Sequence, residues 1–280
     1  MFGISKKKKE ENEHPEYQKL VAKWDTFLAK MDTRFEESLL NAEEALLENL
    51  DESNFNMTSS MQAWSGIKAQ LQNLSDKIED TFDNKVKPQM LAYKEEWDII
   101  DEGQKGILLG ESFYRRIERF QVLLEGKIAQ RFYNHAVQLL NNDFHCTQCS
   151  AKLEVRKDIF RSHYVSCNYC NTVNTFTPNS KINELQYVVE NIAKMKAIDE
   201  WDAMLKAQNE LSEIREPAEG EDNTEYIEGY KKRENAEKKY WAKYFKERYA
   251  FLPQYETAYE HDIAVKMKYF YEERQQRLGY

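Results

Sequence analysis

The segment 144-FHCTQCSAKLEVRKDIFRSHYVSCNYCNTVNTF-176 contains all four cysteines of this 280-residue chain, arranged as two Cys-x-x-Cys pairs. Cys146 and Cys149 form the first pair, Cys167 and Cys170 form the second, and seventeen residues separate the two pairs. A Cys-x-x-Cys turn brings two sulfurs to the same side of the backbone, and two such turns can complete a tetrahedron of four thiolates. The segment is therefore predicted to bind one metal ion.

The expected ion is zinc, because Zn²⁺ prefers four tetrahedral ligands and accepts four thiolates. Four thiolates leave no open position for water, so we expect the zinc to be structural and not catalytic. Iron is one alternative, and a redox-active dithiol or a disulfide is another. His145 and His163 lie close to the cysteines and could replace a ligand. With four cysteines at this spacing, we interpret both histidines as surface or strand residues.

Three short stretches between and after the pairs alternate apolar and polar residues as strands do: KLEVRK (152–157), SHYVS (162–166) and TVNTF (172–176). Together with the cysteine pairs they resemble the four-cysteine zinc ribbon, and the resemblance covers residues 144–177 only. It implies two metal-binding knuckles on a small antiparallel sheet. One feature departs from the family: Ser150 and Asn171 follow the pairs, where such knuckles often have glycine. Asparagine adopts a left-handed backbone conformation more readily than serine.

The sequence on both sides of this segment is typical of long, solvated helices. Nine glycines and five prolines interrupt the whole chain, and 32% of its residues are charged. Ser59 and Gln62 are expected to form a capping box for a second helix, which Pro88 should kink or end. The glycine-rich stretch GQKGILLG (103–110) is read as a turn between two helices.

The expected fold is mainly α, with long antiparallel helices of coiled-coil or bundle type and an inserted small β zinc ribbon. Its parts are expected to be a disordered charged amino terminus (1–14), a helical bundle or coiled-coil region (15–143), the four-cysteine ribbon (144–177), a long helix returning along the third helix (178–215), a linker (216–224) and an aromatic-rich helical hairpin (225–280).

Two stretches suggest contacts with other proteins. Apolar residues in steps of three and four over residues 57–82 predict a homodimer, and an intramolecular bundle is the alternative. Aromatic residues recur at helical spacing in the carboxyl-terminal region, which favours core packing over a protein interface or a surface that stacks on nucleic acid.

The motifs of common enzyme classes are missing from the sequence. It has no His-Glu-x-x-His, Walker or Gly-x-Ser-x-Gly motif, and its one Glu-x-x-His match, at Glu11 and His14, precedes the first expected helix. The net charge of −9 argues against a dedicated nucleic-acid-binding protein. No apolar run is long enough to span a bilayer, and the lysines of MFGISKKKKEENEHP (1–15) are followed by acids and not by the apolar stretch of a secretory signal.

These observations predict a cytoplasmic, non-enzymatic zinc-ribbon scaffold or adaptor. We expect it to bind partner proteins through the ribbon tip or the aromatic carboxyl-terminal helices, for instance during assembly of a larger complex. Two alternatives remain open: a nucleic-acid-binding protein that uses the ribbon, and a membrane-associated helical dimer with the basic amino terminus as its anchor.

Overall fold

The computed structural model describes residues 14–155, 159, 161–178, 180–218 and 220–279. The fold is mainly helical with a small two-stranded sheet, as the sequence predicts. The chain forms two compact units, Met1–Phe120 and Gln121–Tyr280, and helix α4 (Ile100–Asp143) passes from the first into the second. The charged amino terminus, expected to be disordered over residues 1–14, lies outside the described residues except for His14.

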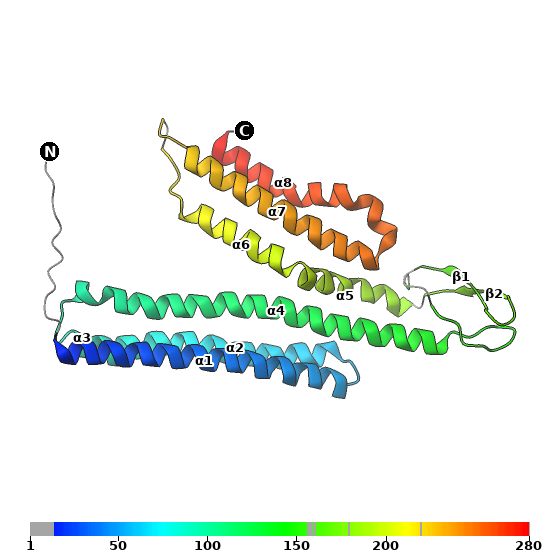
Figure 1. The fold of residues 1–280 in the computed structure, drawn as a ribbon, viewed down its shortest axis with the longest axis horizontal. Helices are drawn as coiled ribbons and strands as arrows, with labels where there is room; N and C mark the ends of the chain where they lie inside the picture. Colours follow the sequence, from blue (N-terminus) through cyan, green and yellow to red (C-terminus); the bar gives the residue numbers. More distant parts are fainter. Residues whose placement is uncertain (1–13, 156–158, 160, 179, 219, 280) are drawn as a thin grey trace. The chain divides into compact units, whose positions relative to one another are not determined.

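The first unit consists of α1 (Pro15–Glu52), α2 (Met57–Thr81) and the first part of α4, which lie side by side (Figure 1). Short elements connect α2 to α4: the π-helical turn η1 (Phe82–Val86), α3 (Lys87–Met90) and the 3-10 helix η2 (Glu96–Ile99). Apolar side chains at helical spacing meet between the long helices and are buried there. They include Trp24, Met31, Phe35, Leu39 and Leu46 of α1, Trp64, Leu71 and Ile78 of α2, and Phe113 and Ile117 of α4.

An arginine on α4 ties that helix to α1. The rings of Phe35 and Phe113 stack with their centroids 4.0 Å apart. The Arg116 guanidinium covers both rings, 4.7 Å from the centroid of Phe35 and 5.0 Å from that of Phe113. It also donates to Asp32 at 2.7 Å and to Glu36, both on α1. Cation–π attraction and two ion pairs thus stabilise the same helix contact.

The cap of α2 differs from the predicted one. Asn54 and Phe55 adopt left-handed conformations, with φ of 56° and 59°, and reverse the chain after α1. Asn56 comes directly after this reversal, and its side chain accepts a hydrogen bond from the Ser59 amide at 3.3 Å. The helix therefore begins at Met57, and the prediction of a capping box at Ser59 and Gln62 was wrong.

The prediction of a turn at GQKGILLG (103–110) was also wrong, because this stretch lies within α4. Its glycines serve close helix packing. A Cβ atom at Gly103 would lie 2.8 Å from the Phe82 ring, and one at Gly106 would lie 3.0 Å from the Trp24 ring. The connection to α4 occurs earlier: α2 passes into the π-helical turn η1 directly ahead of Pro88, and the chain turns after α3. Proline cannot donate to the carbonyl four residues before it, which explains a π-helical turn at this place.

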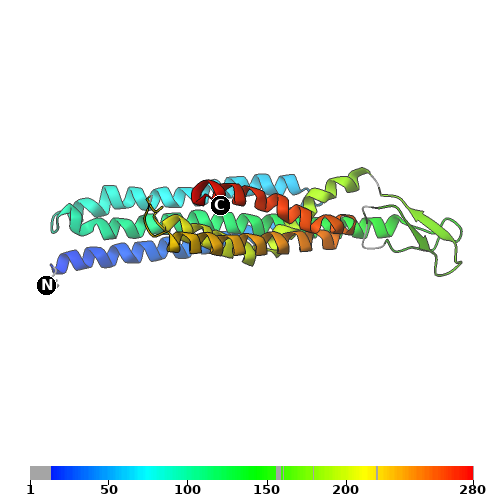
Figure 2. The ribbon, with the colours of Figure 1, turned by 90° about the horizontal axis from the view of Figure 1, so that it is seen from above.

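The second unit contains the end of α4, the cysteine segment, and the helices that follow it (Figure 2). Its helices after the cysteine segment are α5 (Ser180–Lys196), α6 (Ile198–Glu213), α7 (Thr224–Phe251), η3 (Pro253–Ala258) and α8 (Tyr259–Leu278). The single long helix predicted for 178–215 is divided into α5 and α6 at the buried Ala197, which has φ −105° and ψ 20°. Gly126 of α4 lies against Met195 of α5, so these two helices are in contact.

The aromatic residues of α7 form a core and not an open surface, whereas Tyr255 and Tyr269 further along the chain are exposed. Tyr240, Tyr244, Phe245 and Tyr249 of α7 are buried in one cluster with α5 and α6 residues. Arg233 of α7 donates to Glu273 of α8 at 2.7 and 2.9 Å and lies 5.1 Å from the Phe270 ring centroid. The aromatic stripe thus binds α7 to its neighbouring helices, which was the favoured interpretation of its spacing.

Candidate metal centre

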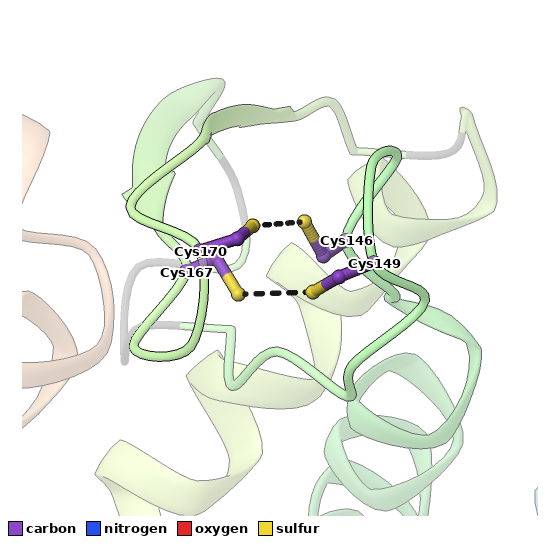
Figure 3. Close-up of side chains that lie close together, drawn as sticks. All are labelled: Cys146, Cys149, Cys167 and Cys170. Carbon is purple, nitrogen blue, oxygen red and sulfur yellow. Dashed lines mark hydrogen bonds between the residues drawn. The ribbon is translucent and has the colours of Figure 1, made fainter.

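The four cysteine sulfurs converge on one point between two turns of the chain (Figure 3). The sulfurs of Cys146 and Cys170 are 3.5 Å apart, those of Cys149 and Cys167 are 3.6 Å apart, and all four lie within 4.8 Å of one another. Four sulfurs at about 2.3 Å from a tetrahedral ion would be separated by about 3.8 Å. All four cysteines are free thiols. The arrangement can hold a metal ion.

The two cysteine pairs have the same backbone structure. The amide of Cys146 donates to Ala151 O at 2.8 Å, and that of Cys167 donates to Thr172 O at 2.9 Å. In both turns the amide four residues after the first cysteine, at Ser150 or Asn171, donates back to that cysteine's carbonyl at 2.9 Å. The same local folding is thus used twice, and it brings each pair of sulfurs to one side.

The turns stand on the small sheet that the alternating residues predict. Strand β1 (His163–Ser166) pairs antiparallel with β2 (Val173–Phe176), within the predicted stretches SHYVS and TVNTF. The stretch KLEVRK was predicted as a strand, but in its described part it contributes only an isolated bridge between Lys152 and His145. Residues 156 and 157 of that stretch lie outside the described part of the chain.

The module has a very small apolar core. Leu153 is buried with Cys146 and Cys167, and Phe144, Ala151 and Val165 pack against them. Such a core is too small to stabilise a fold without a further crosslink, which a bound metal can supply.

Neither nearby histidine belongs to the sulfur cluster. The cluster of possible ligands among the described residues consists of the four cysteines alone. His163 lies on β1 with Nδ1 2.9 Å from Arg161 O, and its ring packs against Phe176. His145 is exposed beside the first pair. The structure thus brings together the residues that the cysteine spacing singles out and leaves both histidines aside.

Backbone amide groups favour the thiolate form at three of the cysteines. The amides of Cys149 and Gln148 lower the pKa of Cys146 to about 6. The Thr172 hydroxyl and amide hold the pKa of Cys170 below its ordinary value. The Ala151 amide also favours the Cys149 thiolate, but its hydrogen bonds with the neighbouring thiols raise its pKa to about 12. A metal ion that binds all four thiolates must displace the protons that the thiols still carry.

One residue of the site has no counterpart in the sequence prediction. Asn174 of β2 is buried, with an exposed fraction of 3%, and its amide contacts both cysteine turns. Val173, beside it on the same strand, is 58% exposed. The sequence did contain a signal for the burial of Asn174. Asn174 lies two positions before Phe176, so both side chains are on the same face of the strand, and that buried face normally carries apolar residues.

Comparisons with protein-family models, with curated proteins and with solved structures gave no match for this chain. None of the described helices combines the length and the apolar character needed to cross a bilayer. The functional interpretation therefore starts from the cysteine cluster and from the surface around it.

Proposed function

We propose that Cys146, Cys149, Cys167 and Cys170 bind one Zn²⁺ ion whose role is structural. The observation that supports this proposal is the convergence of four free thiols at separations close to those of a tetrahedral site. Four thiolates would fill the coordination sphere of zinc, so no position would remain for a substrate or an activated water. The ion would supply folding free energy to a module with a small core. Free thiols also fit a reducing compartment such as the cytoplasm.

The same ligands could hold iron, and metal analysis distinguishes the two ions. Purified protein should contain one equivalent of zinc per chain, measured by inductively coupled plasma mass spectrometry, and a Cys167→Ser variant should contain much less. A stoichiometric iron content with the visible absorption of an iron–thiolate centre would replace zinc by iron. Absence of metal from a protein that also fails to take up zinc would remove the metal centre from the proposal.

We further propose that the chain is a non-enzymatic scaffold or adaptor that binds partner proteins through the metal-stabilised ribbon. The supporting observation is the outer surface of the ribbon. Tyr164 of β1 is 70% exposed, Tyr169 between the second cysteine pair is 83% exposed, and Val173 lies exposed on the neighbouring strand. Tyrosine is enriched at protein interfaces, and a module fixed by metal would present these side chains with little loss of entropy on binding. Assembly of a larger complex is a role that fits such a surface.

The buried aromatic residues of α7 are less suited to this role, because they already form the core of their unit. The seam predicted for a homodimer, residues 57–82, has Trp64, Leu71 and Ile78 buried within the first unit. Two copies that paired through these three side chains would have to open that unit first. The ribbon surface is therefore the better candidate for a partner contact.

The test is affinity capture with the intact chain and with a Tyr164→Ser/Tyr169→Ser double variant. Both changes are at exposed positions, so the metal content should be unchanged. A Tyr187→Ser variant is the matched control, because Tyr187 is an exposed tyrosine on α5, outside the ribbon. Partners lost with the double variant and kept with the control support the adaptor proposal. Identical partner sets for all three proteins would contradict it.

Exposed tyrosines can also stack on single-stranded nucleic acid. The capture is therefore repeated after nuclease treatment and at two salt concentrations. Loss of the captured material after nuclease treatment, with a steep salt dependence of direct binding, would favour the nucleic-acid alternative over a protein partner.

A further inference from the structure

Asn174 occupies an unusual position for an amide side chain. Buried polar or charged side chains are few among the described residues, and Asn174 is the one that lies in the cysteine module. Burying an amide costs free energy unless its hydrogen-bonding groups have partners. An apolar residue at this place would fill the same space beside Phe176 without that cost. The amide therefore needs an explanation in terms of what it contacts.

The oxygen of Asn174 serves the first cysteine pair. Its Oδ1 accepts hydrogen bonds from the Thr147 amide at 2.9 Å and from the Thr147 hydroxyl at 3.0 Å. Thr147 is the residue directly after Cys146. These two bonds use both acceptor positions of the amide oxygen.

The nitrogen of Asn174 serves both pairs. Its Nδ2 donates to Thr172 O at 3.0 Å, which is the carbonyl that also accepts from the Cys167 amide. It also lies 3.6 Å from Cys146 Sγ, as a donor to that sulfur. One side chain therefore contacts a ligand sulfur of the first turn and the backbone of the second, and all its hydrogen-bonding positions are occupied.

We propose that Asn174 is a positioning residue for the metal centre: it holds the two cysteine turns at the spacing that metal binding needs and donates to the Cys146 sulfur. The inference rests on the proposed metal binding and adds a specific residue to it. Hydrogen bonds from the residues around a metal site orient its ligands, and loss of one such partner typically weakens metal affinity by about 10- to 100-fold. A donor to a thiolate also stabilises its negative charge.

Two substitutions separate the donor from the acceptor function. Asn174→Asp keeps an oxygen for Thr147 but cannot donate to Cys146, and it adds a negative charge beside the thiolates. Asn174→Leu removes both functions and keeps the number and branching of the side-chain heavy atoms. Thr175→Ala is the matched control, because Thr175 is the next residue on β2 and is exposed.

The experiment uses the full chain and Co²⁺ as a spectroscopic probe, followed by competition with Zn²⁺ and a chelator of known affinity. Thiolate-to-cobalt charge transfer reports how many sulfurs bind the ion, and the titration reports the affinity. We expect Thr175→Ala to bind like the wild type. Both Asn174 variants should bind about 10- to 100-fold more weakly, yet reach the wild-type charge-transfer intensity at saturation.

The outcomes separate this inference from the proposed metal centre. A wild-type chain that binds neither Co²⁺ nor Zn²⁺ would remove the metal centre, and the inference with it. Wild-type binding together with Asn174 variants whose affinity is within twofold of it would overturn the positioning role alone. Variants that bind more weakly and never reach the wild-type intensity would support a stronger form of it, because the two turns would then not bring all four sulfurs to the ion without Asn174.

Hydrogen exchange gives a second readout at one backbone amide. The Thr147 amide, which donates to Asn174 Oδ1, should exchange faster in Asn174→Leu than in the wild type, both saturated with Zn²⁺. Its rate in Asn174→Asp should stay closer to that of the wild type, since the acceptor is retained. Equal rates in all three proteins would show that the Asn174 side chain does not organise the first cysteine turn and would contradict the inference.

Discussion

Ser150 and Asn171 adopt the same left-handed backbone conformation, with φ of 58° and 60°, at the same place in two different turns. Each residue follows the second cysteine of a pair, and each donates its amide to the carbonyl of the first cysteine. Zinc-ribbon knuckles often have glycine here, and the conformation explains why, because glycine alone adopts positive φ without a steric cost. Asparagine tolerates it better than serine, so the strain of the module is concentrated at Ser150.

We expect Ser150→Gly to stabilise the metal-loaded module, because glycine relieves the left-handed conformation at this position. The gain should be up to about 1 kcal/mol, since the added freedom of glycine in the unfolded chain offsets part of it. Ser150→Val should destabilise the module, because a β-branched residue is a poor fit for positive φ. Thermal unfolding of the cysteine module, monitored by hydrogen exchange of its backbone amides, measures the stability of both variants. A lower stability for Ser150→Gly would show that the serine has another role in the turn.

Removal of the proposed metal ion is predicted to unfold the cysteine module and to leave the helices intact. The module's core consists of a few side chains around Leu153, whereas each helical unit has its own extended core. Addition of a strong chelator should therefore abolish amide protection in residues 161–177 with little change in far-ultraviolet circular dichroism. A large loss of helical signal on chelation would mean that α4 and α5 depend on the metal site for their folding.

How far the sequence predicts this molecule depends on the kind of signal each residue gives. The cysteine spacing identifies all four members of the cluster, because sulfur ligands are rare residues with a fixed geometric requirement. Position 174 was not identifiable in the same way, since an asparagine in a strand normally indicates an exposed side chain. Its burial depends on Thr147, 27 residues away in the chain, and a pattern of local alternation carries no information about that contact.

The helices show the same limit. Apolar residues at helical spacing indicate long helices, but the glycines of 103–110 were wrongly taken as a turn signal. They are needed for tertiary packing, because the Phe82 and Trp24 rings occupy the space that a Cβ atom at these glycines would need. Two tryptophans differ in the same way, since Trp97 of η2 is 80% exposed and Trp24 of α1 is 1% exposed. Periodicity shows that two tryptophans lie on helical faces but does not show which face is covered.

Alkaline pH is predicted to unfold the second unit through its buried tyrosines. Burial, followed by a hydrogen bond to Asp262, raises the pKa of Tyr249 to about 12, and burial also raises the pKa of Tyr240 and Tyr244. An unfolded chain ionises tyrosine near pH 10. These phenols therefore stabilise the fold fully below about pH 10, and the contribution is lost as the pH rises from there toward 12.

Spectrophotometric titration of tyrosinate tests this prediction. The buried tyrosines should ionise together with the loss of helical signal. Tyr249→Phe removes one of the titrating groups and its bond to Asp262. The variant should be less stable at neutral pH, and its stability should fall less steeply above pH 10. Tyrosines that all titrate in one step near pH 10, without unfolding, would contradict the burial of this cluster.

The two tryptophans at opposite extremes of exposure give a direct test of the first unit. Trp24 packs against Phe82 and donates its indole N–H to Glu102 O at 2.9 Å, so Trp24→Ala removes apolar contacts, opens a cavity and leaves a carbonyl without this donor. We expect a loss of about 3–5 kcal/mol in the free energy of unfolding. Trp97→Ala should change it by about 0.5 kcal/mol or less, because an exposed side chain loses few contacts. Denaturant titration followed by circular dichroism measures both variants against the wild type. A cost for Trp97→Ala approaching that of Trp24→Ala would mean that Trp97 is covered in solution, and that η2 packs against a surface of this chain or of a second copy.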